Sequence, residues 1–486
     1  MELRHVHFGR DTAEFDQHLS DYFLKTSTYQ HIVDGQKSIV IGRKGTGKTA
    51  LVRYLVESER TSQEYIVKIE SSHATYVKID ENLRSFVSQV KNLDSSFKLG
   101  WLFTTLLALV ERFTNETTVA VTKEERDLHE FALNNLSYDP ADPVSAIAGY
   151  VTSWIKNLKS LGPATREVTD AKGNFLDEPR LLQMIVGAVQ RVTKKGKKVY
   201  LLFDRLDERW DGSELHVGFL QGLFLAIKDL KAACPGICPV VFLRDDIFDE
   251  VTRDFQHIDH YRMEIEQIRW NEKSLLEMVA LRISSSLTRR GDRVQDENPE
   301  ALWRLVFPED IPYKKNPIPS HAYMIERTLF RPRDIILFAT MAQYLAIGNR
   351  NPHVTIEDLA TSEKEYSLMK LKDLVAEWSY RFPGLDSVLQ RFRRKPAGFE
   401  QDELRLLLLE ICDELGTSLP WIPADDAEFL MLLYSIGFLS YTTRGGILRG
   451  TRVVHSAAEP DANVITEQSR VFISPIFRRA LELRDH

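Results

Sequence analysis

One eight-residue run, Gly42–Thr49, has the residue types and spacing of a phosphate-binding loop. It fits the pattern GxxxxGK[ST], in which glycines let backbone N–H groups turn inward around an anion. The dipole of a following helix favours the same negative charge. Lys48 is expected to reach the terminal phosphates and Thr49 to ligate Mg²⁺. The sequence therefore predicts a site for ATP and Mg²⁺. The residues expected to hold the nucleotide phosphates are Gly42, Arg43, Lys44, Gly45, Thr46, Gly47, Lys48, Thr49 and Ala50.

A second acidic motif follows the apolar run Val199–Phe203 and supplies the carboxylates that triphosphate cleavage requires. Asp204, at the end of this predicted strand, is expected to lie beside the strand that precedes the phosphate loop and to hold Mg²⁺ through water. Asp207 or Glu208, just beyond it, is expected to orient and activate the attacking water, and the sequence does not choose between them. The alternative interpretation is a strand-capping acidic run with ordinary surface charges.

Two arginines stand where a terminal phosphate would be sensed. Arg244 follows the apolar run Val240–Leu243, and the alternative for it is a salt bridge with one of the two aspartates that come next. Arg333 lies in Phe330–Ile335, which looks like a helix start with proline in its first turn. Arg333 is the preferred lid contact to the nucleotide and Arg331 the weaker candidate. A plain helix-start charge is the alternative.

The phosphate loop and the acidic motif need a parallel sheet to bring them together. Apolar runs flanked by helical patterns predict an α/β fold with a P-loop NTPase sheet. More than a hundred residues with helical patterning lie between the second and third strands, which predicts a helical insertion at about 71–185. The strands are expected at Ser38–Ile41, Tyr65–Ile69, Val199–Phe203, Val240–Leu243 and Met263–Ile265. Helices are expected in the insertion at Trp101–Phe113, Lys123–Asn135 and Val144–Leu158, with loop-like segments at Ser137–Pro140 and Gly162–Glu178.

The strand signals stop after Trp270, and amphipathic helices follow. They predict an all-α lid domain, 271–381, after an ATPase core, 1–270. From 382 onward, helices followed by two short strands suggest a winged-helix module that ends at 486. The lid helices are expected at Leu275–Leu287, Pro299–Phe307 and Ile335–Ile347. The terminal module is expected to contain helices at Gln401–Glu414 and Asp425–Ile436 and strands at Phe438–Tyr441 and Arg470–Ile473.

Composition excludes several classes of protein. The chain has 486 residues, 43% of them apolar and 27% charged, which is ordinary for a globular protein. Three cysteines are too few for a disulfide framework, and the chain start lacks an export signal, so a cytoplasmic location is expected. The longest apolar stretch, Trp101–Val110, is too short to span a membrane. A zinc site at Cys234 and Cys238 is not favoured, because no second Cys or His pair completes it.

The motifs together resemble the STAND and AAA+ branch of P-loop ATPases, near the NACHT and KAP groups, over most of the chain. The resemblance rests on Gly42–Thr49, Asp204–Glu208, Arg244, Arg331–Asp334 and the terminal winged helix. It implies that Phe8, Gly9 and Arg10 lie over the adenine ring. It also implies an ATP-driven switch that assembles into homo-oligomers and controls a protein partner, in some members within antiviral defence. The long insertion departs from the family pattern, and no separate effector or sensor domain follows.

Three functions are compared at this point. The preferred one is a Mg-ATP-hydrolysing molecular switch that couples nucleotide state to oligomerisation or partner control. The second is a DNA-associated AAA+ loader or remodeller that uses the winged helix, and the third is a scaffold that binds nucleotide without cleaving it. Base-specific DNA reading is not expected, because Asp425–Ile436 contains three acids and no Lys or Arg. Nonspecific backbone contact remains open for Arg391–Lys395 and for Arg444, Arg449 and Arg452.

Overall fold

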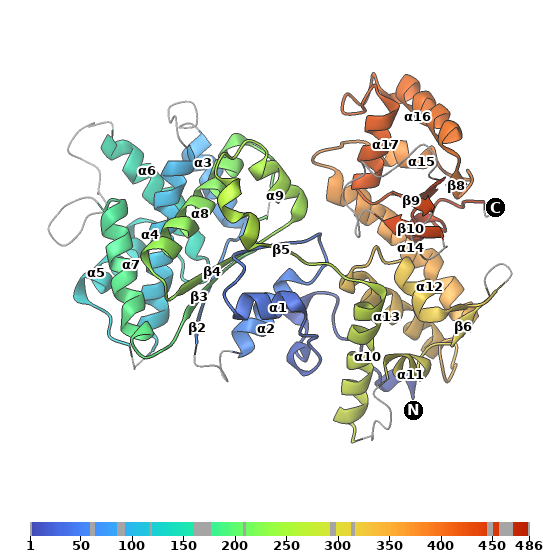
Figure 1. The fold of residues 1–486 in the computed structure, drawn as a ribbon, viewed down its shortest axis with the longest axis horizontal. Coiled ribbons are helices and arrows are strands. Elements are labelled where there is room, and N and C mark those ends of the chain that lie inside the picture. Colours follow the sequence, from blue (N-terminus) through green and yellow to red (C-terminus); the bar gives the residue numbers. More distant parts are fainter. Residues whose placement is uncertain are drawn as a thin grey trace. The chain divides into compact units, whose positions relative to one another are not determined.

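The computed structural model divides the chain into two compact units, each with its own core (Figure 1). Unit 2 is Lys25–Ile268, and unit 1 combines Met1–Leu24 with Arg269–His486. The predicted core of 1–270 therefore differs from the structure at its beginning, because residues 1–24 pack with the C-terminal part of the chain. The structure describes residues 2–58, 64–84, 93–116, 119–158, 176–207, 210–291, 298–312, 316–444, 451–455 and 470–484.

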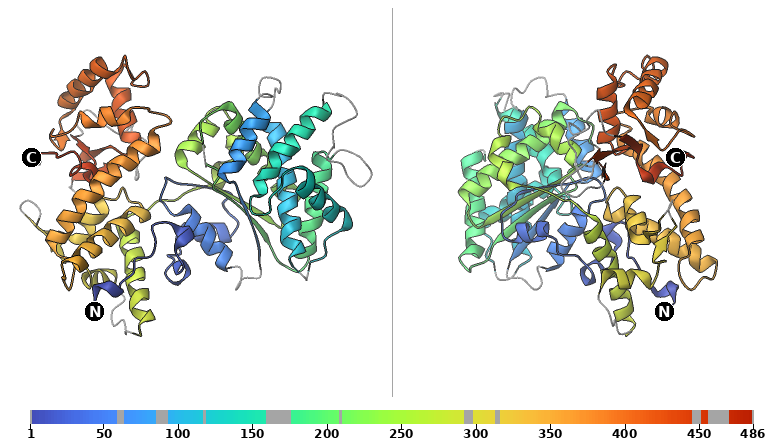
Figure 2. Two further views of the ribbon diagram at one scale, coloured as in Figure 1. Left: turned by 180° about the vertical axis from the view of Figure 1, so that it is seen from behind. Right: turned by 45° about the vertical axis from the view of Figure 1, so that its right-hand side comes forward.

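Unit 2 is built on a five-stranded parallel sheet in the order β2-β3-β4-β1-β5, which confirms the predicted α/β class. The helices α1 and α2 lie on one face of this sheet, and α4 and α8 lie on the other (Figure 2). Burial on both faces explains why β1, β3 and β4 read as continuous apolar runs. The strands are β1 (Ile39–Ile41), β2 (Tyr65–Glu70), β3 (Val199–Asp204), β4 (Ile237–Leu243) and β5 (Ile265–Gln267). The helices around them are α1 (Ser27–Val33), α2 (Lys48–Ser58), α8 (Glu214–Ala233) and α9 (Asp245–Thr252).

The insertion between β2 and β3 is helical, as predicted. Its last helix continues past the expected limit of 185. The segment Gly162–Glu178, predicted to be loop-like, lies mostly outside the described residues. Insertion and sheet share one hydrophobic core, so the insertion is part of unit 2 and not a separate domain. The helices are α3 (His73–Leu83), α4 (Leu93–Thr114), α5 (Lys123–Asn135), α6 (Ala146–Leu158) and α7 (Glu178–Thr193).

The longest insertion helix, α4, has 22 residues, whereas the sequence indicated an apolar stretch of about half that length. By length and composition it could cross a membrane. However, 78% of its most apolar window is buried inside the structure. The indole Nε1 of Trp101 in α4 donates a hydrogen bond to the Phe219 carbonyl of α8 at 2.8 Å. These contacts are those of a core helix.

Unit 1 contains the predicted helical residues and the terminal module in one continuous core, so the structure does not separate them at 381/382. The helix α14 connects the two parts, because the Ser367 hydroxyl in α14 donates to the Ile476 carbonyl and accepts from the Ala480 N–H. The elements of the helical part are α10 (Glu272–Arg289), α11 (Pro299–Arg304), β6 (Asp310–Ile311), β7 (Ile318–Pro319), α12 (Ser320–Glu326), α13 (Pro332–Gly348) and α14 (Ile356–Trp378).

The terminal part of unit 1 forms a small antiparallel sheet in the order β10-β9-β11-β8, covered by three helices. Both predicted helices and both predicted strands are present, and a third strand, β10, occupies part of the connection between the two strands. The elements are α15 (Leu385–Gln390), β8 (Gly398–Phe399), α16 (Gln401–Leu415), α17 (Asp426–Ser435), β9 (Leu439–Arg444), β10 (Thr451–His455) and β11 (Arg470–Ile473).

Candidate nucleotide-binding site

The phosphate loop occupies the strand-loop-helix setting that the sequence predicts. It leaves β1 at Ile41 and enters α2 at Lys48. Gly45 and Gly47 have φ angles of 84° and 97°, which side chains with a Cβ rarely adopt. A Cβ on Gly47 would meet nothing within 4 Å, so its backbone angle and not crowding is what favours glycine there. The loop therefore has the backbone geometry that lets N–H groups face an anion.

The ammonium group of Lys48 is held by the loop itself. Its Nζ donates hydrogen bonds to the carbonyls of Gly42 at 2.6 Å and Arg43 at 3.2 Å. Burial lowers the pKa of Lys48, while the charges of Asp207, Asp245 and Asp204 oppose that effect. Three carboxylates from two strand ends thus act on the same ammonium group, which places the phosphate loop and the acidic motif at one edge of the sheet.

Asp204 is the last residue of β3 and is only 2% exposed. Burial, and next the charge of Glu70, raise the pKa of Asp204 to about 6, although a hydrogen bond from the Arg205 N–H opposes them. Its Oδ2 atom is buried and has no hydrogen-bond partner. A buried carboxylate oxygen without a donor fits a divalent cation, so the residues present suit Mg²⁺ bound with a nucleotide.

One sequence expectation about this sheet is wrong. Asp204 was expected on a strand beside the phosphate strand, but β4 lies between β3 and β1. The neighbours of β1 are thus β5 and β4, which ends at Leu243 just before Arg244, while Asp204 pairs in register with Glu70 of β2. Glu70 was missed, and its position at the end of a predicted strand was the signal that could have identified it.

The remaining acidic residues lie on the loop that follows β3. Asp207 is half-buried, and its carbonyl accepts a hydrogen bond from the Trp210 N–H at 3.3 Å. Glu208, the second candidate for activating water, lies outside the described residues. The choice between these two acids therefore stays open.

Arg244 lies at the start of α9 and is engaged with a neighbour. Its Nε and Nη2 atoms donate to the two carboxylate oxygens of Asp246 at 3.0 and 2.6 Å. Asp245, the next residue, forms an ion pair with Arg43 of the phosphate loop at 3.6 Å. The salt bridge that was the alternative for Arg244 is present, and phosphate sensing by this arginine stays a prediction.

The residues predicted to contact the adenine ring belong to unit 1. The Phe8 side chain is 2% exposed and stacks on Phe307 with ring centroids 5.8 Å apart, so its ring is part of the core of unit 1. Gly9 has a φ of 77°, and a Cβ there would meet Arg282 at 2.2 Å. Arg10 is exposed. Contact of Phe8, Gly9 and Arg10 with an adenine ring stays a prediction.

The two lid arginines have different environments. Arg331 is 6% exposed, and its Nη1 contacts Glu377 of α14 at 3.3 Å. The side chain of Arg333 is 41% exposed and forms an ion pair with Asp11 at 3.5 Å. Unit 1 thus brings the predicted adenine segment and Arg333 together, although they are more than 300 residues apart in the sequence. Of the two arginines, Arg333 has the more exposed side chain, and its contact with a nucleotide stays a prediction.

Two family models match parts of the chain. One, described as ORC-CDC6-like, covers residues 11–207, which run through the phosphate loop to the acidic motif. The other, described as the FunZ-associated C-terminal helical domain, covers residues 273–375. The first match supports a P-loop nucleotide-binding ATPase of the AAA+ kind. The second lies within the range predicted for the helical lid.

Individual relatives are distant. The chain is 23% identical over 497 residues to "Putative transposon gamma-delta 80.3 kDa protein" of Escherichia coli (strain K12), with 98% of this chain and 67% of that protein covered. It is 22% identical over 153 residues to "Allergen Alt a 2" of Alternaria alternata, with 31% of this chain and 76% of that protein covered.

The solved structures that resemble this chain are also distant. The ORC2 protein of Aeropyrum pernix has 11% identity and a TM-score of 0.39, with 96% of this chain and 91% of that chain covered. Cdc6p of Pyrobaculum aerophilum has 12% identity and a TM-score of 0.28, with 92% of this chain and 88% of that chain covered. The site assignment therefore relies on the residues of this chain.

The buried charge of Asp204 predicts a variant that is more stable than the wild type. Its pKa is raised from 3.8 to about 6, so the ionised carboxylate opposes folding above about pH 6, and this penalty disappears below about pH 4. We expect Asp204→Asn to raise the free energy of unfolding by about 1–3 kcal/mol at pH 7.5 without Mg²⁺, and by nothing near pH 4. Urea denaturation at both pH values measures it.

The matched control is Asp207→Asn, which removes a half-buried carboxylate from the same loop and should give a smaller gain. An Asp204→Asn protein that is no more stable than the wild type at pH 7.5 would contradict the proposed electrostatic penalty.

Proposed function

We propose that this protein binds and hydrolyses Mg-ATP and works as a nucleotide-controlled switch. The observation that carries the proposal is the meeting of three features at one edge of the sheet. They are a glycine-shaped phosphate loop, the ammonium of Lys48, and the buried Asp204 carboxylate with an oxygen that lacks a hydrogen bond. The ORC-CDC6-like match over residues 11–207 supports it.

Each residue has a defined task in this proposal. The loop amides and the N-terminus of α2 hold the phosphates, and Lys48 exchanges its hydrogen bonds with loop carbonyls for phosphate oxygens. Thr49 and Asp204 would hold Mg²⁺, which when bound neutralises charge on the phosphates. Asp207 or Glu208 positions the attacking water, and Arg244 and Arg333 sense the terminal phosphate.

Unit 1 contains a physical connection from Arg333 to the terminal module. Two residues near Arg333 in the sequence are anchored to α14 by buried ion pairs. Arg331 pairs with Glu377 at 3.3 Å, and Asp334 pairs with Lys370 at 2.9 Å. The same helix contacts the terminal residues through Ser367. We propose that α14 transmits a change at Arg333 to the terminal module, as a switch requires.

The first prediction concerns the phosphate loop. We expect Lys48→Ala to weaken Mg-ATP binding about tenfold or more, because charge-assisted hydrogen bonds to phosphate are lost. Isothermal calorimetry measures the affinity, and Arg53→Ala on the same helix is the control.

The double variant Asp207→Ala, Glu208→Ala should retain Mg-ATP binding and lose ATP hydrolysis. If Lys48→Ala binds Mg-ATP as tightly as the wild type, the proposed site is refuted. If the wild type binds Mg-ATP but does not hydrolyse it, the scaffold that binds nucleotide without cleaving it is favoured.

The second prediction concerns assembly. The resemblance to switch ATPases implies homo-oligomers, so the mass in solution is expected to differ between the ADP state and a state with a non-hydrolysable ATP analogue. Light scattering coupled to size exclusion measures the mass in each state, with Lys48→Ala as the variant that should not respond. A monomer of unchanged mass in both states would argue against assembly.

DNA association is the second candidate function. In its favour are the ORC-CDC6-like match and a terminal module that we propose is a winged helix, since helices precede an antiparallel sheet with β9 and β10 as a hairpin. The curated relative named as a putative transposon protein is compatible with a role at DNA. Against base reading, the exposed start of α17 is acidic, with Asp425 and Glu428. Arg393 and Arg394 are already paired with Glu482.

The third prediction separates these functions. If DNA is the partner, ATP should strengthen duplex binding, and the logarithm of affinity should fall linearly with the logarithm of salt. Charge reversal of Arg449 and Arg452 should reduce both affinity and salt slope, whereas Arg304→Glu on α11 should not. Fluorescence anisotropy of a labelled duplex measures these quantities. If the protein does not bind duplex DNA, or if ATP and the two charge reversals leave duplex binding unchanged, the switch that controls a protein partner remains as the function.

The cellular setting is proposed on the sequence alone. The location proposed is the cytoplasm. The resemblance implies a role in antiviral defence, in which the switch would control a protein partner.

A further inference from the structure

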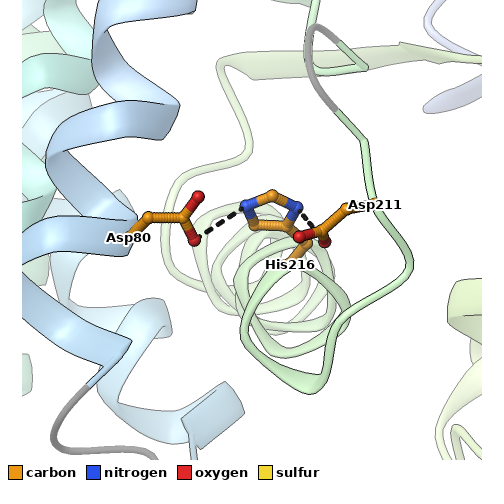
Figure 3. Close-up of side chains that lie close together, drawn as sticks. All are labelled: Asp80, Asp211 and His216. Carbon is orange, nitrogen blue, oxygen red and sulfur yellow. Dashed lines mark ion pairs between the residues drawn. The ribbon is translucent and has the colours of Figure 1, made fainter.

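A histidine of unit 2 lies between two carboxylates, one of which, Asp211, follows the acidic motif in the sequence (Figure 3). The acidic loop is the segment after β3 that runs from Arg205 to Asp211. His216 of α8 is 1% exposed. Its Nδ1 is 2.7 Å from Asp211 Oδ1, and its Nε2 is 3.6 Å from Asp80 Oδ1 of α3. Figure 3 shows one carboxylate on each side of the imidazole ring. The ring therefore bridges the insertion to the segment that follows the acidic motif.

These three side chains are close enough for metal ligands, yet their arrangement suits a bridge better. The two ring nitrogens face different carboxylates, whereas a shared cation needs ligand atoms that converge on one point. In addition, Nη2 of Arg84 lies 3.3 Å from Asp80 and 3.6 Å from Asp211, so a positive charge already serves both acids. The contacts of His216 are thus close electrostatic contacts rather than hydrogen bonds of normal geometry, and they become ion pairs when the imidazole is protonated, beside the guanidinium of Arg84.

The bridge is part of a set of contacts that fixes the acidic loop. Arg205, directly after Asp204, has a φ of 58°, a strained value for a residue with a side chain. Its carbonyl accepts a hydrogen bond from the Ser71 hydroxyl at 2.7 Å, and the Leu206 carbonyl accepts one from the Tyr76 hydroxyl of α3. The His216 bridge holds the far end of the same loop at Asp211.

The rings around His216 restrict it to this position. Tyr76 packs edge-on against the imidazole at 5.0 Å between ring centroids, and Trp210 lies at 6.1 Å on the loop side. Burial lowers the pKa of His216, although the charges of Asp211 and Asp80 oppose this. Asp211 is held in turn, because its Oδ1 accepts the Ser213 N–H at 2.9 Å at the start of α8.

We propose that His216, with Asp80 and Arg84, is a positioning residue for ATP hydrolysis. It acts through Asp211 on the loop that bears Asp207 and Glu208, the candidates for orienting the attacking water. The inference rests on the proposed ATPase function. The triphosphate itself is held by the phosphate loop on another strand, so loss of the bridge affects turnover and not nucleotide affinity.

The test compares Asp80→Asn and His216→Gln with the wild type in steady-state ATP hydrolysis and in Mg-ATP calorimetry. We expect kcat to fall about tenfold, since a small displacement of a water-orienting group has effects of up to about a hundredfold. The ATP Kd should stay within about twofold. The double variant should lose no more than the stronger single variant, because both changes break the same bridge.

Glu111→Gln is the matched control. It removes another half-buried carboxylate that pairs with a histidine of the insertion, His129, at 2.9 Å, but it does so between α4 and α5. Its kcat should equal that of the wild type. The side chain of Asp80 is 28% exposed, so Asp80→Asn tests the positioning role even if His216→Gln does not fold.

The outcomes are distinguishable. A wild type that hydrolyses ATP while Asp80→Asn keeps its full kcat would overturn the positioning role and leave the ATPase proposal intact. An equal loss of kcat in Glu111→Gln would also overturn it, because the effect would then be general. A wild type without hydrolysis would overturn the proposed function and this inference with it.

Discussion

The burial of a carboxylate at the end of β3 is the constraint on which unit 2 depends. Asp204 is almost inaccessible to solvent, one of its oxygens lacks a hydrogen bond, and the nearest carboxylate on the adjoining strand raises its pKa further. Such a group opposes folding unless a positive charge is nearby. Lys48 supplies part of that charge from the phosphate loop. A protein that keeps this arrangement gives up stability for a site that is prepared for a cation.

The phosphate loop is a local feature and could be predicted from the sequence, because glycine spacing, the lysine and the flanking apolar runs all lie within about twenty residues. Four of the five strands could also be predicted, because strands buried in the sheet are largely apolar. The fifth, expected at Met263–Ile265, overlaps β5 only at Ile265, because Met263 and Glu264 belong to a 3₁₀ helix and β5 is a half-buried edge strand. The order of the strands within the sheet could not be predicted. Whether β3 or β4 lies beside β1 depends on how crossovers pack, and periodicity does not record it. Glu70 stands at the end of a predicted strand, but the sequence did not show that this strand pairs with β3 beside Asp204.

The residues whose roles changed are those with distant partners. Phe8 looks like a ligand contact in sequence, but its surroundings are set by Phe307, which is 299 residues away. Arg331 and Arg333 are two positions apart, as the N-cap and the second residue of α13, but the first is buried against Glu377 of α14 and the second is exposed. His216 carried no sequence signal, because its partners come from α3 and from the loop after β3. Local patterns thus located the nucleotide loop, and tertiary contacts assigned the surrounding side chains.

The first 24 residues complete the core of unit 1, although unit 2 separates them from the rest of it in the sequence. Leu3, Val6, Phe8, Leu19 and Tyr22 are all buried there, and the Gln343 side chain of α13 donates hydrogen bonds to the carbonyls of Leu3 and Val6. A recombinant fragment that starts at Arg269 would therefore expose apolar surface and leave an amide group unsatisfied. For dissection of the chain, only the inner unit, Lys25–Ile268, is one continuous segment, and a fragment of the outer unit needs Met1–Leu24 joined to Arg269–His486 by a linker.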